Sequence, residues 1–110
     1  MPLFEKVRIE VYVPDLPTQA YLLLLETLTR EFTYTFGGCT ILRGLDGNYL
    51  SHTGAIIPDR VNVIYSDAPF TLRRHRDALA RYTEELRAAA FEALEEEAIL
   101  VVVSVIHHSG

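Results

Sequence analysis

The sequence predicts a ferredoxin-like α+β sandwich, in which two helices cover one face of a four-stranded antiparallel sheet. Two observations support this fold. The elements expected along the chain follow the order β-α-β-β-α-β, and 110 residues with 49% apolar content are typical of one globular domain. Right-handed crossovers then place the strands in the order 4-1-3-2. We expect residues 1–110 to form a single ferredoxin-like domain.

The first two elements are a strand and a helix. Residues 4–13 alternate between apolar and polar side chains, which is the period of a strand with one buried face. Pro14 cannot continue the hydrogen-bond ladder, and Asp15 or Thr18 can cap a following helix. Residues 18–32 carry apolar side chains at helical spacing and predict an amphipathic helix.

A glycine-rich stretch follows, with five of the six glycines between residues 36 and 54. We assign them to backbone turns, because glycine readily adopts positive φ. Residues 33–44 predict a second strand, in which the glycine pair 37–38 permits a bulge or a sharp bend. Residues 60–66 alternate again and predict the third strand. The segment 43–60 is expected to form a long hairpin connection.

The last two elements are a long helix and an apolar strand. Residues 72–97 have a helical apolar stripe, and Thr71 can act as the N-cap. Residues 98–108 are rich in β-branched side chains, which favour a strand. This strand is apolar on both faces, because Val101 and Val103 point one way while Leu100 and Val102 point the other.

A sheet with helices on one side leaves its other face to water or to a partner. Because the last strand is apolar on that face too, a partner is favoured. Each Val or Leu side chain buried there would contribute about 1.5–3 kcal/mol to association. We therefore expect a homo-oligomer, either a dimer or a trimer.

The centre of the uncovered face is predicted to be polar. The first strand places Lys6, Arg8 and Glu10 on that side, and Asn62 of the third strand is expected beside them. Charged groups under a partner are costly unless they are paired or hydrogen-bonded. Two interpretations stay open: Arg8 and Glu10 form a structural ion pair, or the group forms the floor of a polar pocket between subunits.

The function predicted from these features is that of a binding module for a small molecule or a partner protein, acting through the segment 43–60 and the subunit interface. The alternative is an enzyme with acid/base chemistry in a cavity on the sheet, where Glu10 is the base, Arg8 an anion clamp, and Tyr12 or His52 a donor. A purely structural subunit is a third interpretation. The candidate ligand-binding residues are Arg8, Glu10, Tyr12, Arg43 and Asn62.

Composition argues against several other classes of protein. A formal net charge of -5 disfavours nucleic acid and anionic membrane surfaces as partners. The apolar runs are far shorter than the roughly 20 residues that span a bilayer. A single cysteine, Cys39, and a charged N-terminal stretch lead us to expect a cytoplasmic protein. No cofactor or metal site is predicted, since the adjacent His107 and His108 point to opposite faces of a strand.

Two resemblances are visible at this point. Residues 31–49, "EFTYTFGGCTILRGLDGNY", followed by Gly54 and the strand "RVNVIYS", are similar to a family of small bacterial domains of unknown function. That likeness covers roughly residues 8–108 and implies a ferredoxin-like fold. The overall layout also resembles PII-like signalling proteins, which are trimers of this fold that bind nucleotides or other small metabolites between subunits. This resemblance implies that residues 43–60 occupy the place of a mobile loop.

Overall fold

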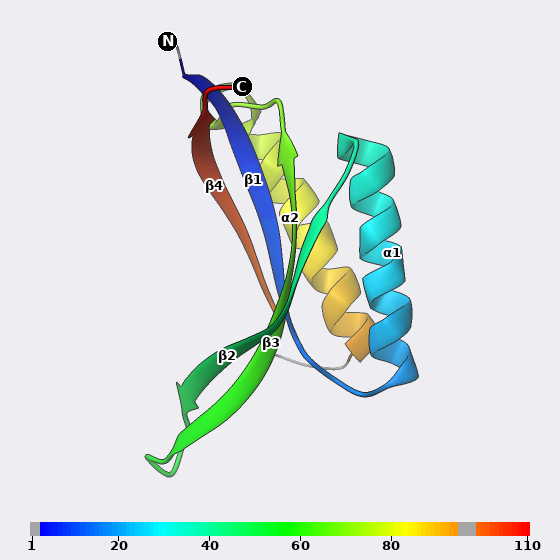
Figure 1. Cartoon of the computed structure of the whole chain (residues 1–110), viewed down its shortest axis with the longest axis vertical. Helices are drawn as coiled ribbons and strands as arrows, with labels where there is room; N and C mark the ends of the chain where they lie inside the picture. The colour runs from blue at the N-terminus through cyan, green and yellow to red at the C-terminus, as the bar shows by residue number, and fades with distance from the viewer. Residues whose placement is uncertain (1–2, 95–98) are drawn as a thin grey trace.

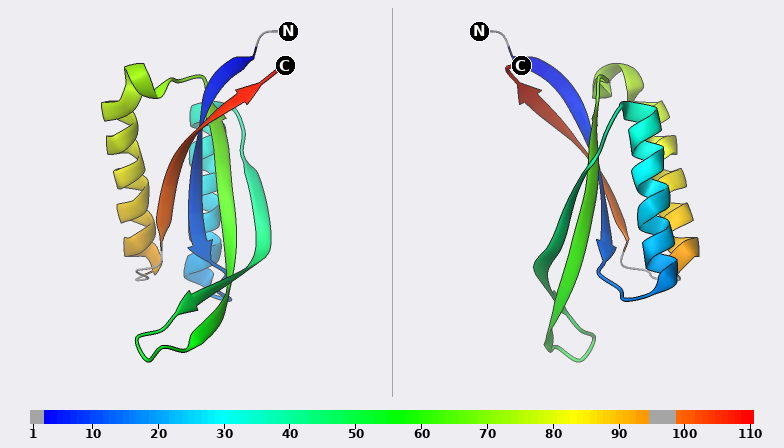
Figure 2. Two further views of the ribbon diagram at one scale, coloured as in Figure 1. Left: turned by 90° about the vertical axis from the view of Figure 1, so that its left-hand side faces the viewer. Right: turned by 45° about the vertical axis from the view of Figure 1, so that its right-hand side comes forward.

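The computed structural model describes residues 3–94 and 99–110 and confirms the ferredoxin-like fold. The strands form one antiparallel sheet in the order β2-β3-β1-β4, as predicted. Both helices lie on the same side of this sheet and leave the other face open (Figure 1; Figure 2). The six elements are β1 (Phe4–Pro14), α1 (Gln19–Phe36), β2 (Thr40–Leu50), β3 (Ile56–Ala68), α2 (Leu72–Leu94) and β4 (Leu100–His108). The predicted end of the second helix and start of the last strand, residues 95–98, lie outside the described residues.

The hydrophobic core lies between the sheet and the two helices. The odd-numbered residues of β1 point towards the helices, and the four valine and isoleucine side chains from Val7 to Val13 are at most 1% exposed. Phe32 of α1 and Ala90 of α2 are completely buried against them. The alternation predicted for the first strand is therefore confirmed, and its even-numbered residues lie on the open face.

The end of α1 corrects the sequence prediction. The helix continues to Phe36, so residues 33–36, predicted as strand, are helical. Gly37 ends the helix in the left-handed conformation, with φ of 92°, and donates its backbone N–H to the carbonyl of Thr33 at 2.9 Å. Glycine is the preferred residue for this position because it has no Cβ to clash. The glycine pair thus caps a helix and does not bend a strand.

The second and third strands form a long hairpin that projects beyond the body of the molecule (Figure 1). Asp46 pairs with Arg60 and Leu50 with Ile56, so most of the predicted connection 43–60 is paired strand. We call residues 43–60 the arm. A bulge interrupts the β2–β3 ladder between Leu42 and Leu45 at the base of the arm.

The cap at Gly37 can be tested by substitution. In Gly37→Ala, a residue with a Cβ atom must adopt the left-handed conformation, and we expect the free energy of unfolding to fall by about 1–2 kcal/mol. Urea denaturation measures this change.

The matched control for the cap is Gly38→Ala. Gly38 has no positive φ, and a Cβ atom at either glycine would meet nothing within 4 Å. The two variants therefore differ in backbone strain and not in steric contact. Equal losses of stability in both would contradict the role of Gly37 as the cap.

Candidate functional site

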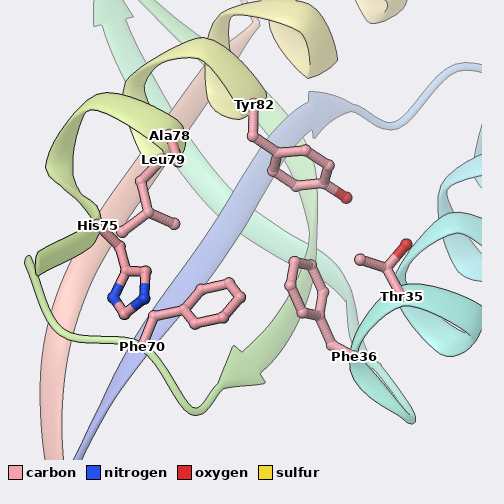
Figure 3. Close-up of a pocket in the computed structure, with 7 residues that line it drawn as sticks. All are labelled: Thr35, Phe36, Phe70, His75, Ala78, Leu79 and Tyr82. Carbon is pink, nitrogen blue, oxygen red and sulfur yellow. The ribbon is translucent and has the colours of Figure 1, made fainter.

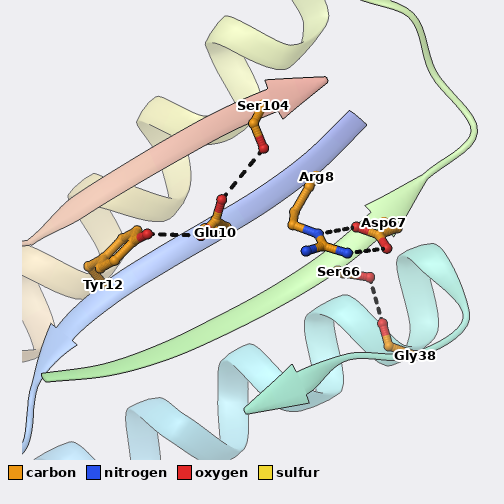
Figure 4. Close-up of polar contacts among 7 residues, drawn as sticks. All are labelled: Arg8, Glu10, Tyr12, Gly38, Ser66, Asp67 and Ser104. Carbon is orange, nitrogen blue, oxygen red and sulfur yellow. Dashed lines mark hydrogen bonds and ion pairs between the residues drawn. The ribbon is translucent and has the colours of Figure 1, made fainter. Parts of the chain in front are cut away.

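The open face of the sheet carries a polar cluster at its centre. Arg8 of β1 lies opposite Asp67 of β3 in the antiparallel register. Its Nε and Nη2 atoms donate to the two carboxylate oxygens of Asp67 at 2.8 and 3.1 Å (Figure 4). The guanidinium carbon also lies 4.2 Å from the centre of the Tyr65 ring, within the range of a cation–π contact. The bidentate bond to Asp67 raises the pKa of Arg8.

Glu10 forms the other half of the cluster with hydroxyl donors. The hydroxyl of Tyr12 donates to Oε2 of Glu10 at 2.9 Å, and Oγ of Ser104 on β4 makes a longer contact with Oε1 at 3.5 Å (Figure 4). The hydrogen bond to Glu10, followed by burial, raises the pKa of the Tyr12 phenol. Tyr12 is therefore held in its protonated, hydrogen-donating form next to the carboxylate.

These contacts rule out one of the two interpretations, a structural ion pair between Arg8 and Glu10. Arg8 pairs with Asp67 and Glu10 binds hydroxyl groups. Residues two apart on one strand are separated by about 6.6 Å of rise, whereas directly opposite residues on neighbouring antiparallel strands have Cβ atoms about 4.5–5.5 Å apart. Arg8 therefore bonds the cross-strand carboxylate of Asp67, whereas the long Tyr12 side chain spans the distance to Glu10 on the same strand.

Asn62 does not lie beside Arg8 and Glu10, which corrects a second expectation. It pairs with Val13 in the β1–β3 register, so its side chain is on the helix-covered face, where it is 1% exposed. The third strand is apolar on both faces, with Val63 on the open side and Ile64 on the helix side. The alternation of apolar residues therefore does not reveal which face Asn62 occupies.

In its buried position, Asn62 connects three parts of the fold. Its Nδ2 atom donates to Oδ1 of Asp15 at 3.2 Å and to the hydroxyl of Tyr21, and its Oδ1 atom accepts from the backbone N–H of Gly44 at 2.7 Å. Gly44 lies in the β2 bulge with φ of 64°. Asn62 thereby anchors the base of the arm to α1 and to the connection that precedes it.

The other two sequence candidates lie away from the cluster. Arg43 is exposed in the β2 bulge, and β3 separates it from Arg8 and Glu10 on β1. His52 lies in the turn at the tip of the arm, between β2 and β3. Within one subunit, His52 is therefore not a donor beside Glu10, and Arg43 does not join Arg8.

A polar pocket of about 330 Å³ adjoins the cluster. It is lined by the turn between α1 and β2, residues 36–40, and by residues 65–67 of β3. Tyr65 and Asp67 thus belong both to the pocket and to the cluster. Ser66 donates a hydrogen bond to the carbonyl of Gly38, which joins the turn to the strand (Figure 4).

Sequence reasoning missed three members of this site: Tyr65, Asp67 and Ser104. They are the cross-strand partners of Arg8 and Glu10, and only the register of the strands brings them together. The detectable signal is the antiparallel pairing itself, because with Val7 opposite Ala68 the next pair must be Arg8 and Asp67. No local motif indicates this register.

Comparison with known proteins shows similarity in structure only. No protein-family model matches the sequence, and no curated protein matches it, so the predicted likeness to a family of small bacterial domains finds no support. The divalent cation tolerance protein CutA1 from Thermus thermophilus has a TM-score of 0.57 at 15% identity, over 97% of this chain and 88% of that one.

Two other solved structures share the fold. CPII, a nitrogen regulatory PII-like protein from Thiomonas intermedia K12 bound to ADP, AMP and bicarbonate, has a TM-score of 0.50 at 18% identity, over 99% of this chain and 100% of that one. A phage SAM lyase in complex with S-methyl-5′-thioadenosine has a TM-score of 0.53 at 13% identity, over 96% and 90%. The resemblance to PII-like proteins is thus confirmed for the fold.

The described residues include no metal cluster. Among residues 3–94 and 99–110, no group of three or more His, Cys, Asp or Glu side chains is placed to hold an ion. In the same part of the chain, neither helix is long and apolar enough to span a lipid bilayer.

Because Asn62 anchors the arm, replacing it with an apolar residue of similar size should strongly lower the free energy of unfolding. Asn62→Leu would leave the buried hydroxyl of Tyr21 and the N–H of Gly44 without their partner. We expect a loss of about 1–3 kcal/mol in the free energy of unfolding, measured by urea denaturation. Asn48→Leu, the same change at an exposed position of β2, should alter stability by less than about 0.5 kcal/mol.

The hydrogen bond between Tyr12 and Glu10 predicts a titration shift. Glu10→Gln removes the negative charge that disfavours the phenolate, so the pKa of Tyr12 should fall towards its ordinary value of about 10. Alkaline absorbance titration, with Tyr12→Phe subtracted to isolate this group, measures the shift. Glu92→Gln, which removes an exposed carboxylate from α2, should leave the Tyr12 midpoint unchanged.

The same bond gives a sign for the pH dependence of stability. The pKa of Tyr12 is higher in the folded chain than in the unfolded one. The contribution of this hydrogen bond to the free energy of unfolding is therefore fully present below about pH 10. It is lost as the pH rises through the folded value. Glu10→Gln should therefore flatten the alkaline limb of the stability curve, and an unchanged limb would contradict this account.

Proposed function

We propose that this chain is a homo-oligomeric module that binds a small molecule where the polar pocket and the cluster on the open face meet a neighbouring subunit. The observation that carries the proposal is the open face itself, on which a hydrogen-bonded polar cluster lies next to an apolar area. That area takes side chains from β2, β3 and β4. Its members are Leu42, Leu45, Val61, Leu100 and Val102.

The apolar area supports association between subunits. Leu42, Leu45 and Leu100 are 43%, 40% and 56% exposed in the single chain. Exposed apolar side chains that share one face of a soluble protein are typical of an interaction surface. Covering them with a second copy would remove this area from water.

The arm supports the same conclusion. Tyr49, Leu50 and Ile56 near its tip are 55%, 71% and 73% exposed, and the arm projects away from both helices (Figure 1). In one subunit these apolar groups have no core to join. In the proposed oligomer, the arm packs against a neighbouring subunit and lies near the polar pocket of that subunit.

The cluster also constrains the ligand. Arg8 is already neutralised by Asp67, so an anionic ligand must displace this carboxylate or bind the pair from outside. The aromatic ring of Tyr65 and the backbone of residues 37–40 complete the pocket. The ligands bound by two proteins that share the fold, AMP with ADP and S-methyl-5′-thioadenosine, are small molecules with an adenosine part, which is consistent with a small organic ligand here.

Native mass spectrometry of the gently purified protein tests the proposal, because it reports the oligomer mass and any retained ligand together. We expect a dimer or trimer with a stoichiometric added mass. An oligomer whose ligand is lost in Asp67→Ala, but kept in the exposed variant Asp77→Ala, would place the ligand at the cluster. A monomer without added mass over the working concentration range would overturn both parts of the proposal.

A second candidate function is an acid/base enzyme, and the hydroxyl contacts of Glu10 favour it. A carboxylate held beside the protonated Tyr12 is a pair that can accept and donate protons. Glu10→Gln separates the two functions. It should abolish turnover of a bound substrate in the enzyme. In the binding module it should leave the oligomer mass unchanged and only weaken retention of the ligand, because the carboxylate is then one of several contacts.

The subunit interface predicts a charge-sensitive position on β4. Leu100→Lys places a charge in the apolar area and should weaken association at least tenfold, since the leucine contributes about 1.5–3 kcal/mol when buried. Analytical ultracentrifugation across a dilution series measures the change.

The control for this position is Leu22→Lys on α1. Leu22 and Leu100 are both 56% exposed, but Leu22 lies on a helix, away from the open face. The Leu22→Lys variant should therefore associate like the unmodified protein. Equal weakening by both substitutions would show that the interface is not the open face.

A further inference from the structure

A second pocket lies on the helix-covered side of the sheet, between the end of α1 and the start of α2 (Figure 3). Its volume is about 250 Å³ and its surface is almost entirely apolar. Three aromatic rings line it: Phe36 at the end of α1, Phe70 before α2, and Tyr82 on α2. His75 and Ala78, from the first turns of α2, also line it.

The ring of Phe36 contacts the other two aromatic rings edge-to-face. The ring centroids of Phe36 and Phe70 are 6.1 Å apart, with an angle of 80° between the ring planes. Those of Phe36 and Tyr82 are 5.6 Å apart, with an angle of 88°. The hydroxyl of Tyr82 donates to Glu31 at 2.9 Å, and that of Thr35 donates to the same oxygen at 3.1 Å. These bonds fix the wall formed by Tyr82, so the pocket does not depend on a freely rotating ring.

His75 places an imidazole ring at the margin of the pocket, and its contacts with Thr71 hold the orientation of that ring. Its Nδ1 atom accepts the backbone N–H of Thr71 at 3.2 Å, while the carbonyl of Thr71 accepts the backbone N–H of His75 at 3.0 Å. An imidazole whose Nδ1 is an acceptor carries its hydrogen on Nε2 when neutral. The centroid of the His75 ring lies 4.7 Å from that of Phe70, with an angle of 31° between the ring planes. Nδ1 also lies 3.2 Å from the carbonyl of Thr71, a contact whose direction depends on the tautomer. Because that carbonyl already accepts the backbone N–H of His75, and Nδ1 is the acceptor of the Thr71 N–H, we assign the hydrogen of the neutral ring to Nε2.

We propose that this pocket binds a small, uncharged aromatic molecule of one or two fused rings with a hydrogen-bond acceptor at its edge. A cavity of about 150 Å³ holds benzene, so a pocket of about 250 Å³ has room for a fused pair of rings. The aromatic walls offer the edge and face contacts that such rings prefer. The apolar lining excludes a charged ligand, and the acceptor meets Nε2–H of His75.

This site differs from the one on the open face in position and in chemistry. The sheet separates the His75 pocket from Arg8 and Glu10, although Phe36 lines both pockets. The lining of the His75 pocket is apolar and aromatic, whereas Asp67 and Ser66 line the pocket beside the cluster. Occupancy of the His75 pocket therefore does not depend on the proposed function, and each site can be tested in the presence of the other.

Quinoline and naphthalene are suitable probes, because they have the same size and differ by a single ring nitrogen that accepts a hydrogen bond. We expect quinoline to produce saturable amide shifts in ¹⁵N-resolved NMR spectra of the full chain, concentrated in residues 35–36 and 70–82. Naphthalene should bind the same residues at least threefold more weakly. Shifts centred on residues 8–12 and 65–67, or no saturable shifts up to millimolar quinoline, would overturn the proposal.

Variants make the test specific to this pocket. Ala78→Phe fills the space from an exposed helix position and should weaken quinoline binding at least tenfold, whereas Ala88→Phe, at another exposed alanine of α2, should not. His75→Phe keeps a ring against Phe70 but lacks the donor, so it should remove the preference for quinoline over naphthalene. Unchanged binding in Ala78→Phe, or an unchanged preference in His75→Phe, would overturn the assignment.

Discussion

The antiparallel register of β1 between β3 and β4 is the constraint on which the rest of the structure depends. The odd-numbered residues of this strand form the floor of the core, and Val7, Ile9 and Val11 are fully buried there. The same register brings Arg8 opposite Asp67 and Glu10 between Tyr65 and Val102. A slip of one residue would reverse both faces and place charges in the core. Burial of these valine and isoleucine side chains therefore determines the position of every group in the polar cluster.

A buried amide has a comparable role at the base of the arm. Because Asn62 is shielded from water, its amide must be satisfied inside the protein, and its partners come from segments distant in sequence. The bond to Gly44 ties it to a residue with positive φ in the bulge, and bulges bend and twist a strand. The direction of the arm, and with it the place where a neighbouring subunit would be met, thus follows from one polar group inside the core.

The sheet also divides the molecule into two chemical environments. On the open face, charged groups and hydroxyls are hydrogen-bonded to one another and remain partly exposed to water, as in the contact between Arg8 and Asp67. On the helix side, the ends of α1 and α2 diverge enough to leave aromatic rings only partly covered, with His75 at their margin. Gly37 ends α1 between these regions, so the same turn borders the polar pocket and follows the ring of Phe36. The position at which α1 ends therefore shapes both pockets.

The sequence by itself determined the order of the elements, the buried face of the first strand and the apolar character of both faces of the last, because periodicity and β-branched residues act locally. It also located Arg8, Glu10 and Tyr12 on the uncovered side. Tertiary structure alone decided that Gly37 caps a helix, that Asn62 faces the core, and that Asp67 and Ser104 complete the cluster. The physical reason is that side-chain period is a property of one strand, whereas partners depend on the register between strands. That register is set by packing of the whole core, which no short segment encodes.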